Sequence, residues 1–240
     1  MIVTNRFVFL HLHKSGGTFV NQLLLRFFSE ARLIGYHLPR AFLPPQFAQL
    51  PLFGLVRNPW DYYVSWYSFQ KMRLAPNPLY NCTSDDGRLG FTATIRNLVT
   101  LGEQPDRLAE LHSRLPNQFT GSGVNLTRKC LVPLTGSCSG FYSFMYQRMY
   151  GDDKDVHFGR MESLRTDLAA FLELLEVDLR AEMIHHIWYE NRTNTSIHRP
   201  YREFYDDATR DLVAVRDAYL INRFGYQFDP EVQRQSAATS

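Results

Sequence analysis

Twice within the first seventy residues, the spacing of apolar positions changes from that of a strand to that of a helix. Residues 6–12 (RFVFLHL) and 52–56 (LFGLV) are short, β-rich apolar runs, typical of strands buried on both faces. After each run the apolar positions take helical spacing, over residues 17–32 and from Pro59 onward. A strand that leads into a helix, repeated along the chain, predicts an α/β fold in which helices flank a central parallel sheet.

The remainder of the chain is expected to extend this pattern. Three further segments read as strands: 33–37 (LIGYH), 155–160 (DVHFGR) and 224–228 (FGYQF), the last closing the sheet. Three segments with helical spacing are expected to be helices: 91–118, 161–175 and 206–223. Two segments rich in polar and turn-forming residues are expected to be loops: 75–90 and 119–140. No repeat or composition change marks a boundary, so a single domain is predicted over residues 1–240.

Composition narrows the classes of partner. The 240 residues are 45% hydrophobic, which is enough for a sizeable core, and the net charge is only +2. A general polyanion binder would carry more charge, so no nucleic-acid partner is expected, and any anion site must be local. No apolar run approaches membrane-spanning length, and no signal-peptide pattern opens the sequence. The expected location is therefore the cytoplasm. A Golgi-luminal domain stays as the alternative, because four N-x-S/T sequons occur, at Asn81, Asn125, Asn191 and Asn194.

The three cysteines do not suggest a disulfide framework. They form neither a CxxC motif nor a zinc-ligand pattern, and a bridge between Cys130 and Cys138 is left open by the sequence. No set of carboxylates has metal-ligand spacing either. We expect no bound metal.

The most informative stretch lies between the first strand and the first helix. It reads HKSGGT, residues 13–18, and its lysine is one of only four in the chain. Glycines let a backbone approach an anion closely, the amides at a helix start point toward it, and Lys14 adds a full charge. This is phosphate-binding chemistry, but the lysine precedes the glycines, whereas in the ATP-binding GxxxxGK[ST] motif it follows them.

A second element repeats the arrangement. Residues 53–69 read FGLVRNPWDYYVSWYSF, so Arg57 follows a strand and Ser65 lies eight residues later, about two helical turns along. A guanidinium at the strand end and a hydroxyl on the following helix can together bind another phosphate.

In their order and spacing, the two elements resemble the PAPS-dependent sulfotransferases, whose fold is related to that of P-loop NTPases. In that family a KSGGT-type turn binds the 5′-phosphosulfate end of the donor PAPS, and an R-x(7)-S element binds its 3′-phosphate. GYHLP at residues 35–39 is similar to the family's THLP segment, which carries the catalytic base. VHFGRMESL, from residue 156, and the C-terminal segment from Tyr201 are also similar to members of bacterial or carbohydrate type.

The resemblance implies a role for each matching residue. His37 would be the general base, and Lys14 would stabilise the departing PAP. The expected nucleotide-binding residues are Lys14, Ser15, Gly16, Gly17, Thr18, Phe19, Arg57, Ser65, His198 and Arg199. Among them, Phe19 stands where many members have a tryptophan and is expected on the adenine. His198 and Arg199 are assigned to the 3′-phosphate in place of the family's Arg-Lys-Gly segment, which this chain lacks. Gly35 stands where the small-molecule branch has a lysine.

The predicted activity is transfer of the sulfuryl group of PAPS to a hydroxyl of a small-molecule or carbohydrate acceptor. Two alternatives stay open. One is a P-loop-type small-molecule kinase that uses ATP and Mg²⁺, which the order of lysine and glycines disfavours. The other is a non-catalytic nucleotide-binding domain on the same fold.

Overall fold

The computed structural model describes residues 1–119, 124–191 and 199–229. The chain divides into two compact units, each built from three segments. The first unit comprises Met1–Arg57, Gln118–Asn125 and Met145–Thr195, and the second comprises Asn58–Asn117, Leu126–Phe144 and Ser196–Ser240. The prediction of one domain stays a prediction.

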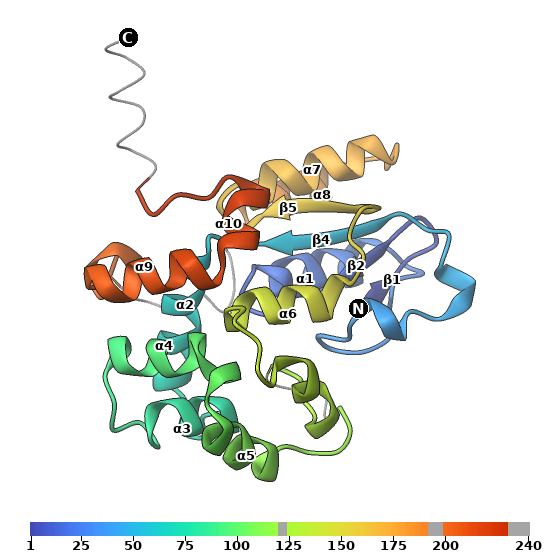
Figure 1. Cartoon of the computed structure of the whole chain (residues 1–240). Coiled ribbons are helices and arrows are strands. Elements are labelled where there is room, and N and C mark those ends of the chain that lie inside the picture. Colours follow the sequence, from blue (N-terminus) through green and yellow to red (C-terminus); the bar gives the residue numbers. More distant parts are fainter. Residues whose placement is uncertain (120–123, 192–198, 230–240) are drawn as a thin grey trace, which may run out of the picture. The chain divides into compact units, whose positions relative to one another are not determined.

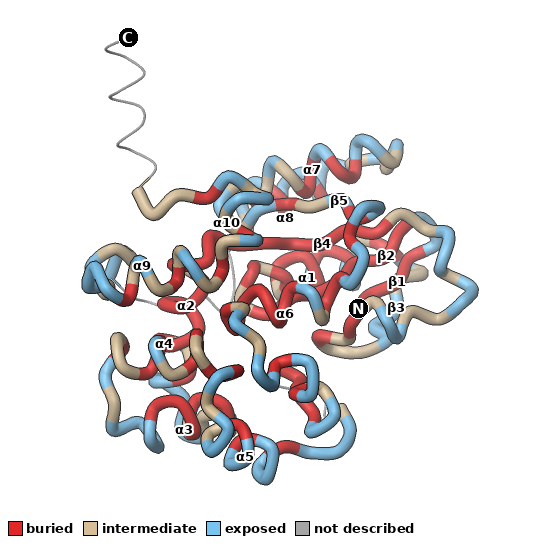
Figure 2. Tube along the Cα trace, in the orientation of Figure 1, coloured by how far each residue is buried: buried red, intermediate tan, exposed pale blue. Residues whose placement is uncertain are grey.

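The first unit contains a five-stranded mixed sheet (Figure 1) in the order β3-β1-β2-β4-β5. Its strands are β1 (Ile2–Val3), β2 (Val8–Leu10), β3 (Arg32–Leu33), β4 (Leu52–Val56) and β5 (Val156–Arg160). β2, β4 and β5 are parallel, whereas β1 pairs antiparallel with both β2 and β3. The parallel centre that the apolar runs predicted is therefore confirmed, and all five residues of β4 are buried (Figure 2).

Helices enclose both faces of β4. α1 (Gly17–Phe27), α7 (Leu164–Leu174) and α8 (Ala181–Tyr189) contribute to one hydrophobic core with the strands, in which the rings of Phe53 and Phe171 stack at 4.4 Å. At Gly54 the missing side chain admits α6 (Phe141–Tyr150), because a Cβ there would lie 2.5 Å from the Tyr150 ring. The Tyr150 hydroxyl accepts from the Leu55 amide at 3.0 Å and donates to its carbonyl at 2.8 Å.

The second unit is helical. Its helices are α2 (Pro59–Lys71), α3 (Pro78–Ser84), α4 (Phe91–Val99), α5 (Pro105–Arg114), α9 (Asp207–Arg216) and α10 (Ala218–Phe224). A buried carboxylate joins three of its segments. Asp217 accepts a hydrogen bond from the Tyr63 hydroxyl at 2.7 Å and two from Ser143, from its amide at 2.8 Å and its hydroxyl at 2.7 Å.

Three predicted elements need correction. The strand expected at 33–37 is only Arg32–Leu33, since His37 takes a left-handed φ of 50° that an extended strand excludes. The loop expected at 75–90 contains α3, which Asn77 caps by accepting from the Tyr80 amide at 2.8 Å. The strand expected at 224–228 is wrong because Gly225, at φ 61°, ends α10 as a left-handed cap.

Some elements, among them β1 and α6, had no counterpart among the predictions. β1 has only two residues, too few for a periodic pattern, and the aromatic residues of α6 do not follow one helical stripe. Such segments are recognised only by what they pack against.

We predict that Asp217→Ala lowers the free energy of unfolding by roughly 3 kcal/mol or more, because it leaves three buried donors without an acceptor. Urea unfolding of the full chain measures the change. Asp211→Ala, which removes an exposed pair with Arg210, is the matched control and should cost less than about 1 kcal/mol. Equal losses in the two variants would contradict the importance of the buried contacts.

Candidate functional site

The candidate site begins at the carboxyl-terminal ends of the parallel strands, the edge where ligands bind in open α/β sheets. The chain leaves β2 at Leu10 and enters α1 at Gly17, so HKSGGT forms the turn that the sequence predicted. No side chain caps α1, and of its first amides that of Phe19 donates to the carbonyl oxygen of Gly16 at 3.1 Å. A helix start of this kind can accept an anion.

Both glycines of the turn are sterically required. Gly16 has a φ of 86°, and a Cβ there would lie 2.5 Å from the sulfur of Met161, which follows β5. A Cβ on Gly17 would lie 2.1 Å from the imidazole of His11. The turn is thus held tightly by its neighbours, and any larger residue would displace the His11 ring or Met161.

Ser15 and Lys14 supply the turn's polar side chains. Ser15 is fully buried, and its hydroxyl has no hydrogen-bond partner among the residues that the structure describes. A buried hydroxyl of this kind points to a missing ligand. Burial, together with the charge of nearby Arg57, lowers the pKa of Lys14 to about 8.

Arg57 connects the two sequence elements. It directly follows β4, is 9% exposed, and donates from Nη1 to the carbonyl oxygen of Lys14 at 3.0 Å. That carbonyl belongs to the peptide unit whose amide is Ser15, so the guanidinium lies against the turn itself. The residues that follow β2 and β4 therefore lie side by side.

His37 also lies close to this turn, although it follows a different kind of strand from the one predicted. It follows the antiparallel edge strand β3, not a parallel strand as predicted, yet its Nδ1 lies 2.9 Å from the carbonyl oxygen of His11. A carbonyl only accepts, so Nδ1 carries the hydrogen and Nε2 keeps its lone pair. Burial, only partly offset by this hydrogen bond, lowers the pKa of His37 to about 4. The ring is therefore neutral at neutral pH.

His11 and His13 pack beside His37, with ring centroids 4.3 Å and 5.8 Å from it. Burial also holds the pKa of each well below its usual range. The amide of Asn21 donates to His11 Nδ1 at 3.0 Å, which leaves the hydrogen of His11 on Nε2. His11 is thus oriented as a donor and His37 as a base.

Of the remaining predicted residues, two lie in α1 and two in the second unit. Phe19 is 2% exposed in the core, stacked on His186 at 5.2 Å, so its ring does not face solvent. Thr18 is partly exposed in the first turn of α1. Ser65 is buried on α2 in the second unit, and Arg199, also there, is exposed and 3.5 Å from Glu203. His198 lies outside the described residues.

The cluster also contains residues that the sequence analysis did not assign. Arg148 on α6 bears a charge that contributes to lowering the pKa of both His13 and His37. Its Nη2 donates to the carbonyl oxygen of Asn125 at 2.9 Å, and the amide of Asn125 donates to the carbonyl of Tyr36 at 2.9 Å. Neither residue lies in a phosphate-binding motif, and only the fold brings them to His37.

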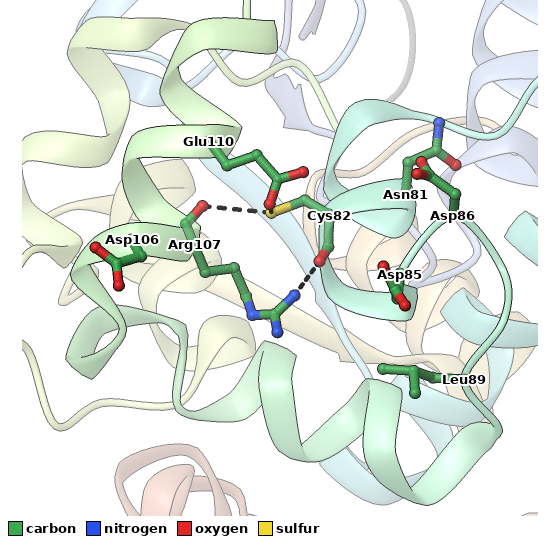
Figure 3. Close-up of a pocket in the computed structure, with 8 residues that line it drawn as sticks. All are labelled: Asn81, Cys82, Asp85, Asp86, Leu89, Asp106, Arg107 and Glu110. Carbon is green, nitrogen blue, oxygen red and sulfur yellow. Dashed lines mark hydrogen bonds between the residues drawn. The ribbon is translucent and has the colours of Figure 1, made fainter.

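A separate cavity of about 340 Å³ lies in the second unit (Figure 3). Its lining residues are Asn81, Cys82, Asp85, Asp86, Leu89, Asp106, Arg107 and Glu110. Several of these carboxylates pair with arginines, as Asp85 does with Arg88 and Glu110 with Arg114. Burial raises the pKa of the Cys82 thiol to about 11, which makes it a poor nucleophile. The acidic lining does not suit a phosphate.

Other features bear on the class of site. Across the described ranges, no group of three or more His, Cys, Asp or Glu side chains is arranged to hold a metal ion. All three cysteines are thiols, so Cys130 and Cys138 are not bridged. None of the helices in the described part is both long and apolar enough to cross a membrane.

Comparison with known proteins adds no relative: no protein-family model matches the chain, and no curated protein matches it significantly. Together, the fold and the site define a mixed α/β protein with a buried, cation-rich turn at the carboxyl ends of its parallel strands.

We predict that the affinity for inorganic sulfate falls as the pH rises through about 8, because Lys14 loses its proton there. Sulfate keeps its own charge over this range, so the effect reports on the protein. Isothermal titration at constant ionic strength should show a decrease on the order of tenfold between pH 7 and pH 9.5. Lys14→Arg is the matched control, since a guanidinium stays charged. A flat profile in the wild type would exclude Lys14 from the anion site.

Proposed function

We propose that this protein is a sulfotransferase that moves the sulfuryl group of PAPS to a hydroxyl of a small-molecule or carbohydrate acceptor. The observation that carries the proposal is the hydrogen bond from Arg57 to the Lys14 carbonyl, which unites the two phosphate-binding elements of the sequence. The P-loop-like sulfotransferase fold and a cytoplasmic location belong to the same proposal.

The residues of the turn fit the donor. The unpartnered Ser15 hydroxyl and the uncapped amides of α1 suit the oxygens of a 5′-phosphate, and Lys14 and Arg57 supply charge. Two cations brought together in a buried site raise each other's energy, and a polyanionic nucleotide relieves this repulsion. The charge that lowers the pKa of Lys14 thus favours anion binding.

The reaction is an in-line displacement at sulfur. His37 Nε2 takes the proton of the acceptor hydroxyl while the acceptor oxygen forms its bond to sulfur. The bond between sulfur and the bridging oxygen breaks, and its electron pair leaves with the 5′-phosphate of PAP. Lys14 stabilises the charge that develops on that oxygen. His37 is neutral and correctly oriented before the substrate binds, and the anionic donor raises its pKa toward a useful range.

The rival functions predict different ligands. A kinase would bind ATP with Mg²⁺, and a non-catalytic domain would bind a nucleotide without cleaving it. The strand beside the turn is followed by Arg57, which suits a further phosphate. This feature and the order of lysine and glycines favour PAP over ATP–Mg²⁺.

We predict that PAP raises the melting temperature of the full chain more than ATP or ATP–Mg²⁺ does, because a ligand stabilises the state that binds it. Arg57→Ala should weaken PAP binding at least about tenfold through loss of a charged contact. A larger shift with ATP–Mg²⁺ would favour the kinase and overturn the proposal.

We predict that His37→Ala retains PAP affinity but slows PAPS turnover by about 10²–10⁴-fold, the usual contribution of a general base. Release of labelled sulfate from PAPS measures turnover with water as the acceptor. His112→Ala, an exposed histidine on α5, is the control and should leave turnover unchanged. PAP binding by a wild type that never cleaves PAPS would indicate the non-catalytic domain.

A further inference from the structure

Arg148 and Asn125 are adjacent, and each has one buried polar atom that makes no hydrogen bond to the described residues. The Nη1 of Arg148 is buried and has no hydrogen-bond partner within the described ranges, and the same holds for Oδ1 of Asn125. The hydrogen bond from Arg148 Nη2 to the Asn125 carbonyl keeps the two residues adjacent. Buried polar groups are satisfied in folded proteins, so this pair points to a ligand.

The orientation of each side chain is fixed by its other contacts. The amide nitrogen of Asn125 donates to the Tyr36 carbonyl at 2.9 Å, so its oxygen is the atom left over. The guanidinium of Arg148 lies 5.2 Å from the centre of the Phe119 ring, which supports it from one side. A guanidinium held in this way keeps its fork available for a carboxylate or a sulfate.

The pair lies next to the proposed base. Asn125 is bonded to Tyr36, whose ring is 4.3 Å from that of its neighbour His37. The charge of Arg148 also reaches His37 and His13. The donor phosphates, in contrast, are assigned to the turn at Lys14 and Ser15.

We propose that Arg148 and Asn125 form the acceptor subsite, and that the acceptor carries an anionic group close to the hydroxyl that reacts. Arg148 binds the anionic group, and the amide oxygen of Asn125 accepts from a further hydroxyl or N–H of the same molecule. This deepens the proposed function and rests on it. It selects hydroxy acids, such as sugar acids and phenolic acids, over their neutral analogues.

The test compares matched acceptors on the wild type without nucleotide. One pair is 4-nitrophenyl β-glucuronide and the corresponding glucoside, and the other is 4-hydroxybenzoate and 4-hydroxybenzamide. Ligand-observed NMR titration gives the affinities. We expect at least one acid to bind about tenfold or more tightly than its neutral partner, since a charge-assisted contact distinguishes them.

Two variants and one control test whether the preference for acids depends on Arg148 and Asn125. Arg148→Gln and Asn125→Asp should each remove the preference, the second because it places a carboxylate beside Arg148. Asparagine and aspartate both tolerate the φ of 56° at position 125, so the fold is retained. Arg40→Gln, which removes a surface pair with Asp155 in the same unit, should leave the preference unchanged.

The outcomes separate this proposal from the proposed function. Equal binding of both members in each pair, with PAP still bound, would overturn the acidic acceptor and leave the sulfotransferase standing. If instead Arg148→Gln slowed PAPS hydrolysis without changing either affinity, Arg148 would act on the sulfuryl group, which also overturns the subsite. Absence of PAP binding would reject the proposed function, while an Arg148-dependent acid preference would still identify an anion subsite.

Discussion

The candidate site depends on one hydrogen bond between two strand ends, from the Arg57 guanidinium to the carbonyl of Lys14. Parallel pairing of β2 with β4 is what makes this bond available, because it brings the residues after both strands to one edge. The bond also orients the peptide unit of Ser15. A cation held at this position compensates part of the cost of its burial through the carbonyl dipole.

The same electrostatics explains the histidines. Burial and nearby cations both disfavour an imidazolium ion, so His11, His13 and His37 all remain neutral. Neutrality alone does not make a base, since the hydrogen must also lie on the correct nitrogen. The carbonyl of His11 fixes that hydrogen on His37 Nδ1, whereas the amide of Asn21 fixes the opposite tautomer on His11. Two neighbouring rings, both with lowered pKa values, are thereby given different chemistry.

The sequence predicted those features that depend on neighbouring residues and missed those that depend on distant contacts. The strand at 52–56 and the helix from Pro59 were correct, because burial on both faces and a proline at a helix start leave direct marks in the residues. Gly225 was taken for part of a strand because its role as a helix cap depends on a φ that composition does not reveal. His37 was assigned from a motif, but its route from an antiparallel edge strand could not be predicted from that motif.

The proposed donor and acceptor ends of the site also differ in how far the sequence reveals them. The proposed donor end is built from turns that directly follow strands, so its residues lie in two short stretches of sequence with a recognisable spacing. The proposed acceptor end combines Tyr36, Asn125 and Arg148, which are far apart along the chain and are joined by hydrogen bonds to backbone carbonyls. Such contacts constrain position more than residue type, so the motifs that predicted the turn do not predict them. In the proposed sulfotransferase, these segments could therefore change with the acceptor while the turn from His13 to Thr18 stays the same.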